Sequence, residues 1–500
     1  MASPKCFPAR AAIFANGVRA TGFLWGCLAL GLAVAAAAEP DKKTTAEPPD
    51  LRTRRDGDDW PRFLGPTGDS KSRETGIRIG WPEAGPPLVW QKRVGDGYGM
   101  PAISRGRLLQ FGGFGNQMRL MCMESETGKE LWTFEYTTEY QDLYGYDIGP
   151  RCAPLVDGDR VYLFGVEGML HCLRVIDGSV VWKIDTSEKF GVIQNFFGVG
   201  STPAIEGDLL IVQVGGSPDE SKSVPPGQLN RVKTNGTGVV AFDKYTGKVK
   251  YELGDELASY ASPVLATIDG RRWCFVFARG GLLAFDPTAG TLDFDYPWRA
   301  SALESVNASN PVVVGDLVFI SETYGPGSSL LRVRPGNYEV VWSDKDKRRD
   351  KSLQTHWNTP IHHEGFLYGS SGRHAENAEL RCIELATGKV MWDVPGLSRS
   401  SLLYVDGHFV CLTEQGIVLL FRANSEKFDL VAQTILPTQD APRLGGGSAR
   451  LLKAPAWAAP ILSHGLLYLR GADRLVCLEL IPAPKEKKND EDGRAKTQRK

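Results

Sequence analysis

The chain has 500 residues and a formal net charge of −1 at pH 7. This near-neutral balance excludes binding to nucleic acid or to an anionic membrane that is driven by bulk charge. The 56 glycines, the 31 prolines and an aromatic content of 10% suit many turns between packed strands, and no useful amphipathic helical pattern follows residue 40. The composition therefore favours an all-β fold.

The first 38 residues have the features of a secretory signal peptide. Arg10 and Arg19 lead into an apolar run from Gly22 to Ala38, which ends in small residues before Glu39. We therefore expect cleavage and export to the periplasm or out of the cell. The alternative is an uncleaved anchor, because an apolar run of this length is at the short limit for a membrane-spanning helix.

Charged segments without apolar periodicity flank the central part of the chain. Residues 39–59 are predicted to form a disordered spacer, and residues 483–500 are predicted to form a disordered, charged tail. Residues 60–482 are predicted to form one large domain, because rings built from repeats often exceed the usual domain size.

A short β-hairpin pattern recurs along this domain. In the clearest copy, residues 380–392, two apolar runs flank Thr387-Gly388. Glycine can take the positive φ that a tight hairpin turn requires. In five copies an aromatic residue stands four positions after the turn glycine, namely Trp132, Trp182, Tyr251, Phe294 and Trp392.

A second hairpin precedes each of these and begins at a proline, as in residues 154–162 and 360–368. The prolines recur at spacings of 53, 49, 60, 48, 49 and 100 residues, and the last spacing equals two periods with the middle proline missing near Leu402. Two hairpins per period give four strands per repeat, which is typical of a propeller blade.

The number of repeats predicts how the ring closes. There are eight upstream hairpins but seven downstream ones, because the last repeat ends at residues 477–480 without its final strand. Residues 88–94, which contain Trp90, have the pattern of that missing strand. We predict an all-β, eight-bladed propeller of four-stranded antiparallel blades, closed by this N-terminal strand so that no sheet edge stays exposed.

The cysteines occupy a repeated position. Cys122, Cys172, Cys382 and Cys477 share one site on the third strand of their repeats, where Ala241 stands in another copy. Cysteine and alanine at one repeated position are expected to be small side chains that pack in the interior of each blade. Because they lie on different blades, we expect neither disulfides nor a metal site.

The repeat at residues 241–251 and 382–392 resembles the pyrroloquinoline quinone (PQQ)-like β-propeller repeat family, and the resemblance covers residues 88–480. The segment at residues 59–66, before the first repeat, is similar to the corresponding segment of exported propellers from planctomycete-type bacteria. The family contains quinone-dependent alcohol dehydrogenases and non-enzymatic scaffolds similar to the propeller subunit of the outer-membrane protein assembly machine. The resemblance implies that a repeated aromatic residue docks on the neighbouring blade, and the matching residues are Trp90, Trp132, Trp182, Tyr251, Phe294, Trp342 and Trp392.

Strand parity places the longest connections on one face of the ring, opposite the hairpin turns. Long loops on a rigid scaffold often carry function, and these loops are rich in residues that dominate protein interfaces. The alternative is that the aromatic residues only pin the loops down. The candidate partner- or ligand-binding residues are Tyr146, Asn195, Phe197, Trp298, Arg299, His356, Trp357 and Arg373.

The sequence carries no phosphate-binding loop, no Gly-x-Ser-x-Gly and no His-Glu-x-x-His motif, and it lacks the adjacent cysteine pair of the quinone dehydrogenases. We therefore expect no catalytic residues, no metal and no resident cofactor. The favoured function is that of an exported, monomeric, non-enzymatic scaffold, peripheral to a membrane at most, whose loop-rich face binds a protein or cell-envelope partner. The alternative is a dehydrogenase of alcohols or sugars that holds PQQ and calcium in the axial funnel.

Overall fold

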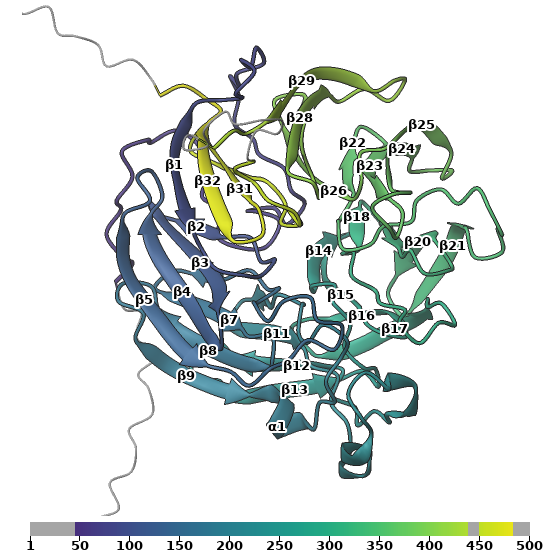
Figure 1. Cartoon of the computed structure of the whole chain (residues 1–500). Coiled ribbons are helices and arrows are strands. Elements are labelled where there is room, and N and C mark those ends of the chain that lie inside the picture. Colours follow the sequence, from purple (N-terminus) through teal and green to yellow (C-terminus); the bar gives the residue numbers. More distant parts are fainter. Residues whose placement is uncertain (1–45, 439–449, 484–500) are drawn as a thin grey trace, which may run out of the picture. The chain divides into compact units, whose positions relative to one another are not determined.

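The protein is a ring of eight blades in the computed structural model, which describes residues 46–438 and 450–483 (Figure 1). Each blade is a separate four-stranded antiparallel sheet. The prediction of an all-β, eight-bladed propeller is therefore confirmed. The predicted signal peptide, residues 1–38, and residues 484–500 of the predicted tail lie outside the described residues.

Blades 1 to 4 each consist of four strands that are consecutive in the chain. Blade 1 contains β2 (Ala102–Ser104), β3 (Arg107–Phe114), β4 (Gln117–Glu124) and β5 (Glu130–Thr137). Blade 2 contains β6 (Leu155–Asp157), β7 (Arg160–Phe164), β8 (Met169–Arg174) and β9 (Val180–Asp185). Blade 3 contains β10 (Ala204–Glu206), β11 (Leu209–Gln213), β12 (Val239–Asp243) and β13 (Val249–Leu253). Blade 4 contains β14 (Val264–Ile268), β15 (Arg271–Phe277), β16 (Gly281–Asp286) and β17 (Thr291–Pro297).

Blades 5 to 7 repeat this order, and blade 8 combines both ends of the domain. Blade 5 contains β18 (Val312–Val314), β19 (Leu317–Ser321), β20 (Ser328–Arg334) and β21 (Asn337–Ser343). Blade 6 contains β22 (Ile361–His363), β23 (Phe366–Ser371), β24 (Glu379–Glu384) and β25 (Val390–Pro395). Blade 7 contains β26 (Ser400–Val405), β27 (His408–Thr413), β28 (Ile417–Arg422) and β29 (Asp429–Ile435). Blade 8 contains β30 (Ile461–Ser463), β31 (Leu466–Arg470), β32 (Arg474–Glu479) and β1 (Leu88–Arg93).

The helical pieces of the described residues are short. They are the α-helix α1 (Thr186–Phe190) and the 3₁₀-helices η1 (Asp219–Ser223) and η2 (Leu229–Arg231). None of them is long and apolar enough to cross a membrane.

Burial explains the strand sequences. Second strands such as β7 are buried along their whole length, because they lie between two neighbouring blades, and they read as continuous apolar runs. Outer strands such as β5 alternate between exposed and half-buried residues, since only one side faces the next blade. Figure 1 shows the outer strands, for example β21 and β25, at the periphery of the ring.

Strand β1 closes the ring by pairing antiparallel with β32, and Trp90 stands opposite Cys477. The predicted closure by the N-terminal strand is therefore confirmed. The expectation that no sheet edge stays exposed is wrong, because each blade is its own sheet and keeps a free edge on its outer strand. Contacts of side chains with the neighbouring blade hold the ring together, because no sheet hydrogen bonding continues from one blade to the next.

Most of these contacts are the same hydrogen bond, from an aromatic side chain on the outer strand to a backbone carbonyl in a turn of the next blade. The indole N–H of Trp132 donates to the carbonyl of Val175 at 3.1 Å, and that acceptor lies three residues before the turn glycine Gly178 of the next blade. The same offset holds for the other glycine-containing turns that accept such a bond. They are Trp90 to Ser125 at 2.9 Å, Trp182 to Lys244 at 3.1 Å, Tyr251 to Pro287 at 2.6 Å and Trp342 to Leu385 at 2.9 Å.

Three blades vary this contact, and in one of them, blade 7, Ala432 stands at the aromatic position. Trp392 donates to the carbonyl of Asn424 at 2.8 Å, in the one turn that lacks the glycine. Phe294 has no donor, and its ring packs against Tyr338 with 4.9 Å between the ring centroids. An aromatic residue at this position therefore keeps its packing role even where the hydrogen bond is lost.

The repeated cysteine stands directly opposite the docking aromatic residue. Cys122 pairs with Trp132, Cys172 with Trp182 and Cys382 with Trp392, and a β-bulge follows each pair. The described cysteines are all free and buried. Burial raises the pKa of the Cys122 thiol to about 12, so that this cysteine stays a neutral packing residue.

The part of the predicted spacer that the structure describes, residues 46–59, is held against the propeller and differs from the disorder expected of it. Glu126 of blade 1 accepts bonds from the backbone N–H groups of Thr53 and Arg54 at 2.8 and 3.0 Å. Arg54 also pairs with Glu479 at 2.5 Å. The charged residues of this segment therefore have partners on the blades, which a sequence pattern does not reveal.

We call residues 46–81 the leader. It crosses the hairpin-turn face from blade 1 to blade 7: Trp60 bonds Ile103 of blade 1 at 2.9 Å, and Ser72 bonds Tyr404 of blade 7 at 2.9 Å. The backbone N–H of Arg78 donates at 2.8 Å to Leu480, which follows the last strand of blade 8. The leader therefore spans the point where the ring closes.

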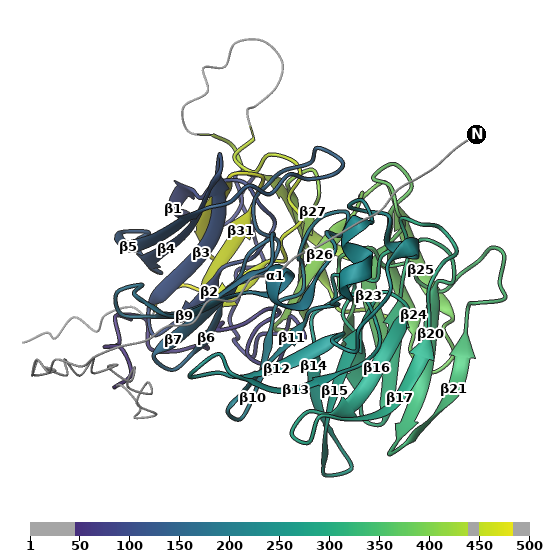
Figure 2. The same ribbon diagram turned by 90° about the horizontal axis from the view of Figure 1, so that it is seen from below.

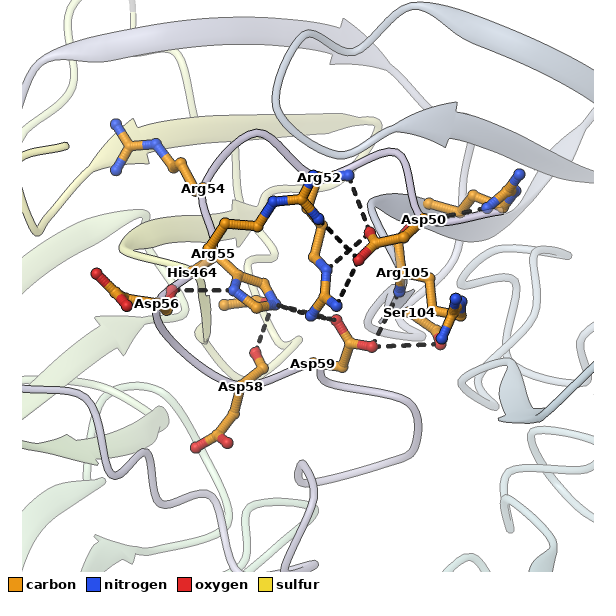
Figure 3. Close-up of polar contacts among 12 residues, drawn as sticks. Asp50, Arg52, Arg54, Arg55, Asp56, Asp58, Asp59, Ser104, Arg105 and His464 are labelled. Atoms are coloured by element: carbon orange, nitrogen blue, oxygen red, sulfur yellow. Dashed lines mark hydrogen bonds and ion pairs between the residues drawn. The ribbon is translucent and has the colours of Figure 1, made fainter. Parts of the chain in front are cut away.

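His464, in the β30–β31 turn, holds residues 52–59 of the leader in place (Figure 3). Its Nδ1 lies 3.0 Å from the carbonyl of Asp56, and its Nε2 lies 3.0 Å from Asp59 and 3.2 Å from Arg52. Because a carbonyl only accepts, Nδ1 carries a hydrogen. In the neutral ring Nε2 accepts from Arg52, and in the protonated ring it donates to Asp59. Burial lowers the pKa of His464, but the bonds to Asp59 and Asp56 outweigh it and raise the pKa above its usual value.

Replacing a docking glycine tests the packing between blades. Gly178 has φ +73°, and an added Cβ would lie 2.6 Å from the Trp132 ring, whereas Gly158 has φ +57° with open space around it. We expect Gly178→Ala to lower the free energy of unfolding by about 1–3 kcal/mol more than Gly158→Ala does, because both changes strain the backbone and only the first overpacks a contact. Denaturant unfolding of both variants measures the difference, and equal losses would contradict the docking role.

The contact of His464 predicts a pH-dependent stability. A group with a raised folded pKa contributes stability that is complete below its unfolded pKa of about 6.5 and is lost as the pH rises through the folded pKa. His464→Gln should therefore destabilise the protein more at about pH 5.5 than at about pH 8.5. Urea unfolding at both values checks this, with His408→Gln, at the start of β27 in the neighbouring blade, as control. An equal cost of His464→Gln at both pH values would contradict it.

Candidate functional site

The long connections share the face opposite the leader. They join the second and third strands of a blade, as in residues 214–238, or one blade to the next, as in residues 138–154 and 186–203. Figure 2 shows α1 and the other helical turns on the upper side of the blades, while the hairpin turns of blade 4 point down. We call this side the loop face.

A cavity of about 180 Å³ lies on the axis of the ring. Each of the eight connections from one blade to the next contributes to its lining, and they do so through Tyr98, Arg151, Gly200, Tyr260, Ala308, Trp357, Arg399 and Trp457. The leader contributes Phe63, Leu64 and Ser70. Because the leader lies on the hairpin-turn face, it forms the floor of the cavity, and the opening is on the loop face.

Stacked rings form one wall of the cavity. The ring of Trp457 lies 4.5 Å from that of Tyr98 and 4.5 Å from that of Trp357, measured between centroids. The guanidinium of Arg399 lies over Trp357 at 4.4 Å and over Trp457 at 5.3 Å. The guanidinium of Arg151 lies 5.3 Å from the Tyr98 ring. We call these five residues the aromatic wall; they are Tyr98, Arg151, Trp357, Arg399 and Trp457.

Carboxylates neutralise both arginines of the wall. Arg399 donates to Glu414 at 2.8 Å and makes a second, shorter contact with the same carboxylate. Arg151 donates to Asp142 at 2.9 Å and to Asp147 at 3.3 Å. The wall therefore combines delocalised cations with aromatic faces, while its net charge is close to zero.

His356 is held neutral beside the wall. An arginine can only donate, so the 3.4 Å contact from Arg399 makes Nδ1 of His356 the acceptor and places the ring hydrogen on Nε2, which lies 3.0 Å from the hydroxyl of Tyr324. Burial, and then the positive charges of Arg399 and Arg373, lower the pKa of His356 to about 3. This histidine therefore orients its neighbours as a fixed hydrogen-bonding group.

An exposed apolar rim continues the wall towards solvent. Leu143, Tyr144 and Tyr146 are 41%, 52% and 57% exposed. Tyr146 lies 6.1 Å from Trp457 and 5.6 Å from Phe197, and Tyr144 lies 5.6 Å from Phe197. Large apolar residues that are grouped on the surface mark interaction sites more often than single ones do.

Four of the candidate residues from the sequence come together here, namely Tyr146, Phe197, His356 and Trp357, which all line the cavity. The other four do not reach it. Trp298 is 1% exposed and donates its indole N–H to Gly327 at 3.2 Å, so it packs in the interior and has no surface to offer a partner.

The remaining three candidates connect loops. Asn195 donates to the carbonyl of Ala258 at 3.1 Å, and Arg299 donates to the side chain of Asn230 at 2.7 Å. Arg373 is exposed and lies 4.4 Å over the ring of Tyr324. These contacts hold the loop face in shape, in accordance with the alternative that some of the loop residues serve mainly to pin the loops.

Sequence reasoning missed seven of the eight axial residues, although the repeat contained the signal for them. Each of the eight axial residues stands three positions before the first residue of its upstream hairpin. Tyr98, Arg151, Tyr260 and Trp457 precede Pro101, Pro154, Pro263 and Pro460 by three, and Arg399 precedes Leu402, where the proline is missing. Reading this column across the repeats would have identified the axis.

The side chains around the cavity do not fit a calcium-bound quinone. Calcium prefers six to eight oxygen ligands, but in residues 46–438 and 450–483 no three His, Cys, Asp or Glu side chains form a group that could hold a metal ion. The carboxylates nearest the aromatic wall, those of Asp142, Asp147 and Glu414, are each paired with an arginine. The cavity is also smaller than the roughly 300–1,000 Å³ of usual small-molecule sites.

Comparison with known proteins agrees with the fold. A family model described as outer membrane protein assembly factor BamB matches residues 87–217 and 118–394. Among solved structures, BamB from Moraxella catarrhalis is similar with a TM-score of 0.52 and 13% identity, over 78% of this chain and 97% of that one. The quinohemoprotein alcohol dehydrogenase from Comamonas testosteroni is similar with a TM-score of 0.44 and 14% identity, over 85% and 81%. No curated protein matches the sequence.

The environment of His356 predicts its titration. Because burial and the neighbouring arginines favour the neutral ring, we expect no titration of His356 between about pH 5 and pH 8. In Arg399→Gln, which removes one positive charge, the midpoint should rise but stay below the usual value, since burial remains. NMR of isotope-labelled histidine measures this, and the loss of one signal in His356→Gln assigns it. A midpoint near 6.5 in the unchanged protein would contradict the geometry.

Proposed function

The chain belongs to the PQQ-like β-propeller repeat family whose model is described as outer membrane protein assembly factor BamB, and we propose that it is an exported, non-enzymatic scaffold. Its loop face binds a protein partner of the cell envelope. Residues 1–38 act as a signal peptide in this proposal, and residues 60–482 are the part that functions. The protein acts as a monomer, peripheral to a membrane at most.

One observation carries the proposal: the exposed rim of Leu143, Tyr144 and Tyr146 continues into the aromatic wall without a break. Tyrosine, tryptophan and arginine are the residues that contribute most to binding energy at protein interfaces. They present a large contact area with few rotatable bonds, which limits the entropy lost on binding.

The loop face is also arranged before a partner arrives. Arg279, which is 4% exposed, donates to the carbonyls of Ser305 and Leu303 at 3.1 and 2.8 Å and to the side chain of Asn230 at 3.1 Å. This buried guanidinium ties the 298–311 connection to the loop that contains η2. A surface that is ordered in advance loses less free energy on association.

The dehydrogenase alternative has less support from the geometry. The polar side chains of the cavity are engaged with one another, as Arg399 with Glu414 and His356 with Tyr324. A redox enzyme needs a group placed to accept a proton from its substrate, and a histidine whose pKa lies near 3 is a poor base at neutral pH.

Removing the rim tests the scaffold. We expect the double change Tyr144→Ser/Tyr146→Ser to weaken binding of the partner by about 30-fold or more, because loss of an interface hot spot costs at least about 2 kcal/mol. Val180→Ser/Leu292→Ser is the control, since these residues are 47% and 42% exposed on the outer strands β9 and β17.

The measurement is cross-linking and affinity capture from the envelope fraction of cells that export the tagged protein, followed by titration of the captured partner. A partner held by the unchanged protein and by the control, and lost by the rim variant, supports the scaffold. Recovery of the same proteins with all three would count against it. Dye reduction with an alcohol or a sugar, dependent on added PQQ and calcium, would favour the dehydrogenase.

A further inference from the structure

We infer that the axial cavity binds one neutral aromatic ring, presented as a side chain by the polypeptide partner of the loop face. The inference rests on the proposed function for the source of the ring, while the ligand class follows from the cavity itself. Four properties of the cavity support it: its asymmetry, its size, its charge and its closed end.

The asymmetry comes from the repeat position that faces the axis. Large side chains occupy this position on one side, where Trp357, Arg399, Trp457, Tyr98 and Arg151 follow one another around the ring and form the aromatic wall. On the other side the same position holds Gly200, Tyr260 and Ala308. The Tyr260 ring fills the space next to Gly200, where an added Cβ would lie 2.7 Å from it, so the small side chain of Ala308 is the one that leaves a space facing the aromatic wall.

The size of that space matches a single ring. An engineered apolar cavity of about 150 Å³ takes up benzene, and the axial cavity measures about 180 Å³. Its lining is mostly apolar, with Phe63, Leu64, Met100 and Val306 around the rings. A flat aromatic ligand would lie offset-stacked or edge-on against Trp357 and Trp457, as aromatic pairs prefer.

The charges select a neutral ligand. The four Nη hydrogens of Arg151 are all engaged, with the side chains of Asp142 and Asp147 and with the carbonyls of Asp147 and Gly149. Arg399 is paired with Glu414 and also donates to the carbonyl of Arg373 at 3.1 Å. Arg151 Nε and Trp457 Nε1 have no hydrogen-bond partner among the described residues, so an anion would find few free donors. A cation would meet two guanidinium groups that already occupy the aromatic faces.

The closed end requires that the ring enter from the loop face. Phe63 and Leu64 of the leader form the floor, and Leu64 is 3% exposed. The exposed rim of Leu143, Tyr144 and Tyr146 lies at one side of the cavity, and Tyr146 is part of the cavity lining. A partner segment lying on this rim would therefore direct one aromatic side chain down the axis, as interface anchors fill central pockets.

Four ligands that share one ring test the inference by isothermal titration calorimetry on the full-length protein. Indole and N-acetyltryptophanamide are neutral, indole-3-acetate is an anion and tryptamine is a cation. We expect the neutral ligands to bind with a dissociation constant of about 1 mM or tighter, and the charged ones at least about tenfold more weakly. Absence of indole binding at about 10 mM, or equal binding of all four ligands, would overturn the inference.

A cavity-filling variant locates the binding site. Ala308→Trp should abolish binding of indole, and Ala308→Leu, a smaller change, should weaken it at least about threefold. Ala289→Trp is the matched control, because Ala289 is exposed on the hairpin-turn side of blade 4. Unchanged affinity in a folded Ala308→Trp protein would overturn the axial site, and Ala308→Leu decides the question if the larger residue prevents folding.

The outcome of the indole titration can be distinguished from the outcome of the partner capture. Indole binding that Ala308→Trp abolishes, without capture of any partner, would support the ligand class of the cavity while it counts against the scaffold. Capture of a partner that still binds fully to Ala308→Trp would overturn the role of the ring and leave the scaffold intact. Self-association of the protein that indole displaces would identify a second copy as the source of the ring, and would overturn the inference that a different polypeptide supplies it.

Discussion

The ring depends on one repeated interaction between neighbouring blades. An aromatic side chain on the outer strand lies against the turn glycine of the next blade and donates a hydrogen bond to the carbonyl three residues before that glycine, as Trp132 does to Val175 beside Gly178. Glycine has two roles there, because it allows the positive φ of the turn and leaves room for the aromatic side chain. The apolar burial of the aromatic side chain supplies the energy, and the hydrogen bond fixes the angle between blades.

Regular docking has a second effect at the axis. Since most blades are placed by the same contact, one sequence position of every repeat faces the centre, and the side chains at that position decide whether the axis is filled or open. In this protein they form a wall of rings and guanidinium groups on one side and leave space beside Ala308 on the other. The functional character of the propeller therefore lies in eight residues that the repeat itself leaves free to vary.

The sequence predicted the fold because the fold is periodic. The spacing of turn glycines and aromatic residues gave the blade count, and the unpaired last repeat gave the closure by β1. The site was predicted only in part, since Tyr146, Phe197, His356 and Trp357 were selected as loop residues while Trp457, Arg151 and Arg399 were missed. Their contacts join residues that are far apart in the chain, as between Tyr98 and Trp457, and composition alone also marked Trp298, which is buried. The charged residues 46–59 resembled a solvated spacer because their partners, such as Glu126 and Glu479, stand at distant positions.

The closing strand imposes an order on biogenesis. Residues 46–93 are synthesised early, yet the partners of β1 and of the later part of the leader lie in blades 7 and 8, so these segments must wait until those blades have been made. Until then the chain is an open arc with an unpaired strand at each end, and such edges invite pairing with other chains. A cell that makes this protein must therefore shield a growing β-structure through almost its entire translation or translocation, and the final step that removes the hazard is a contact between its two ends.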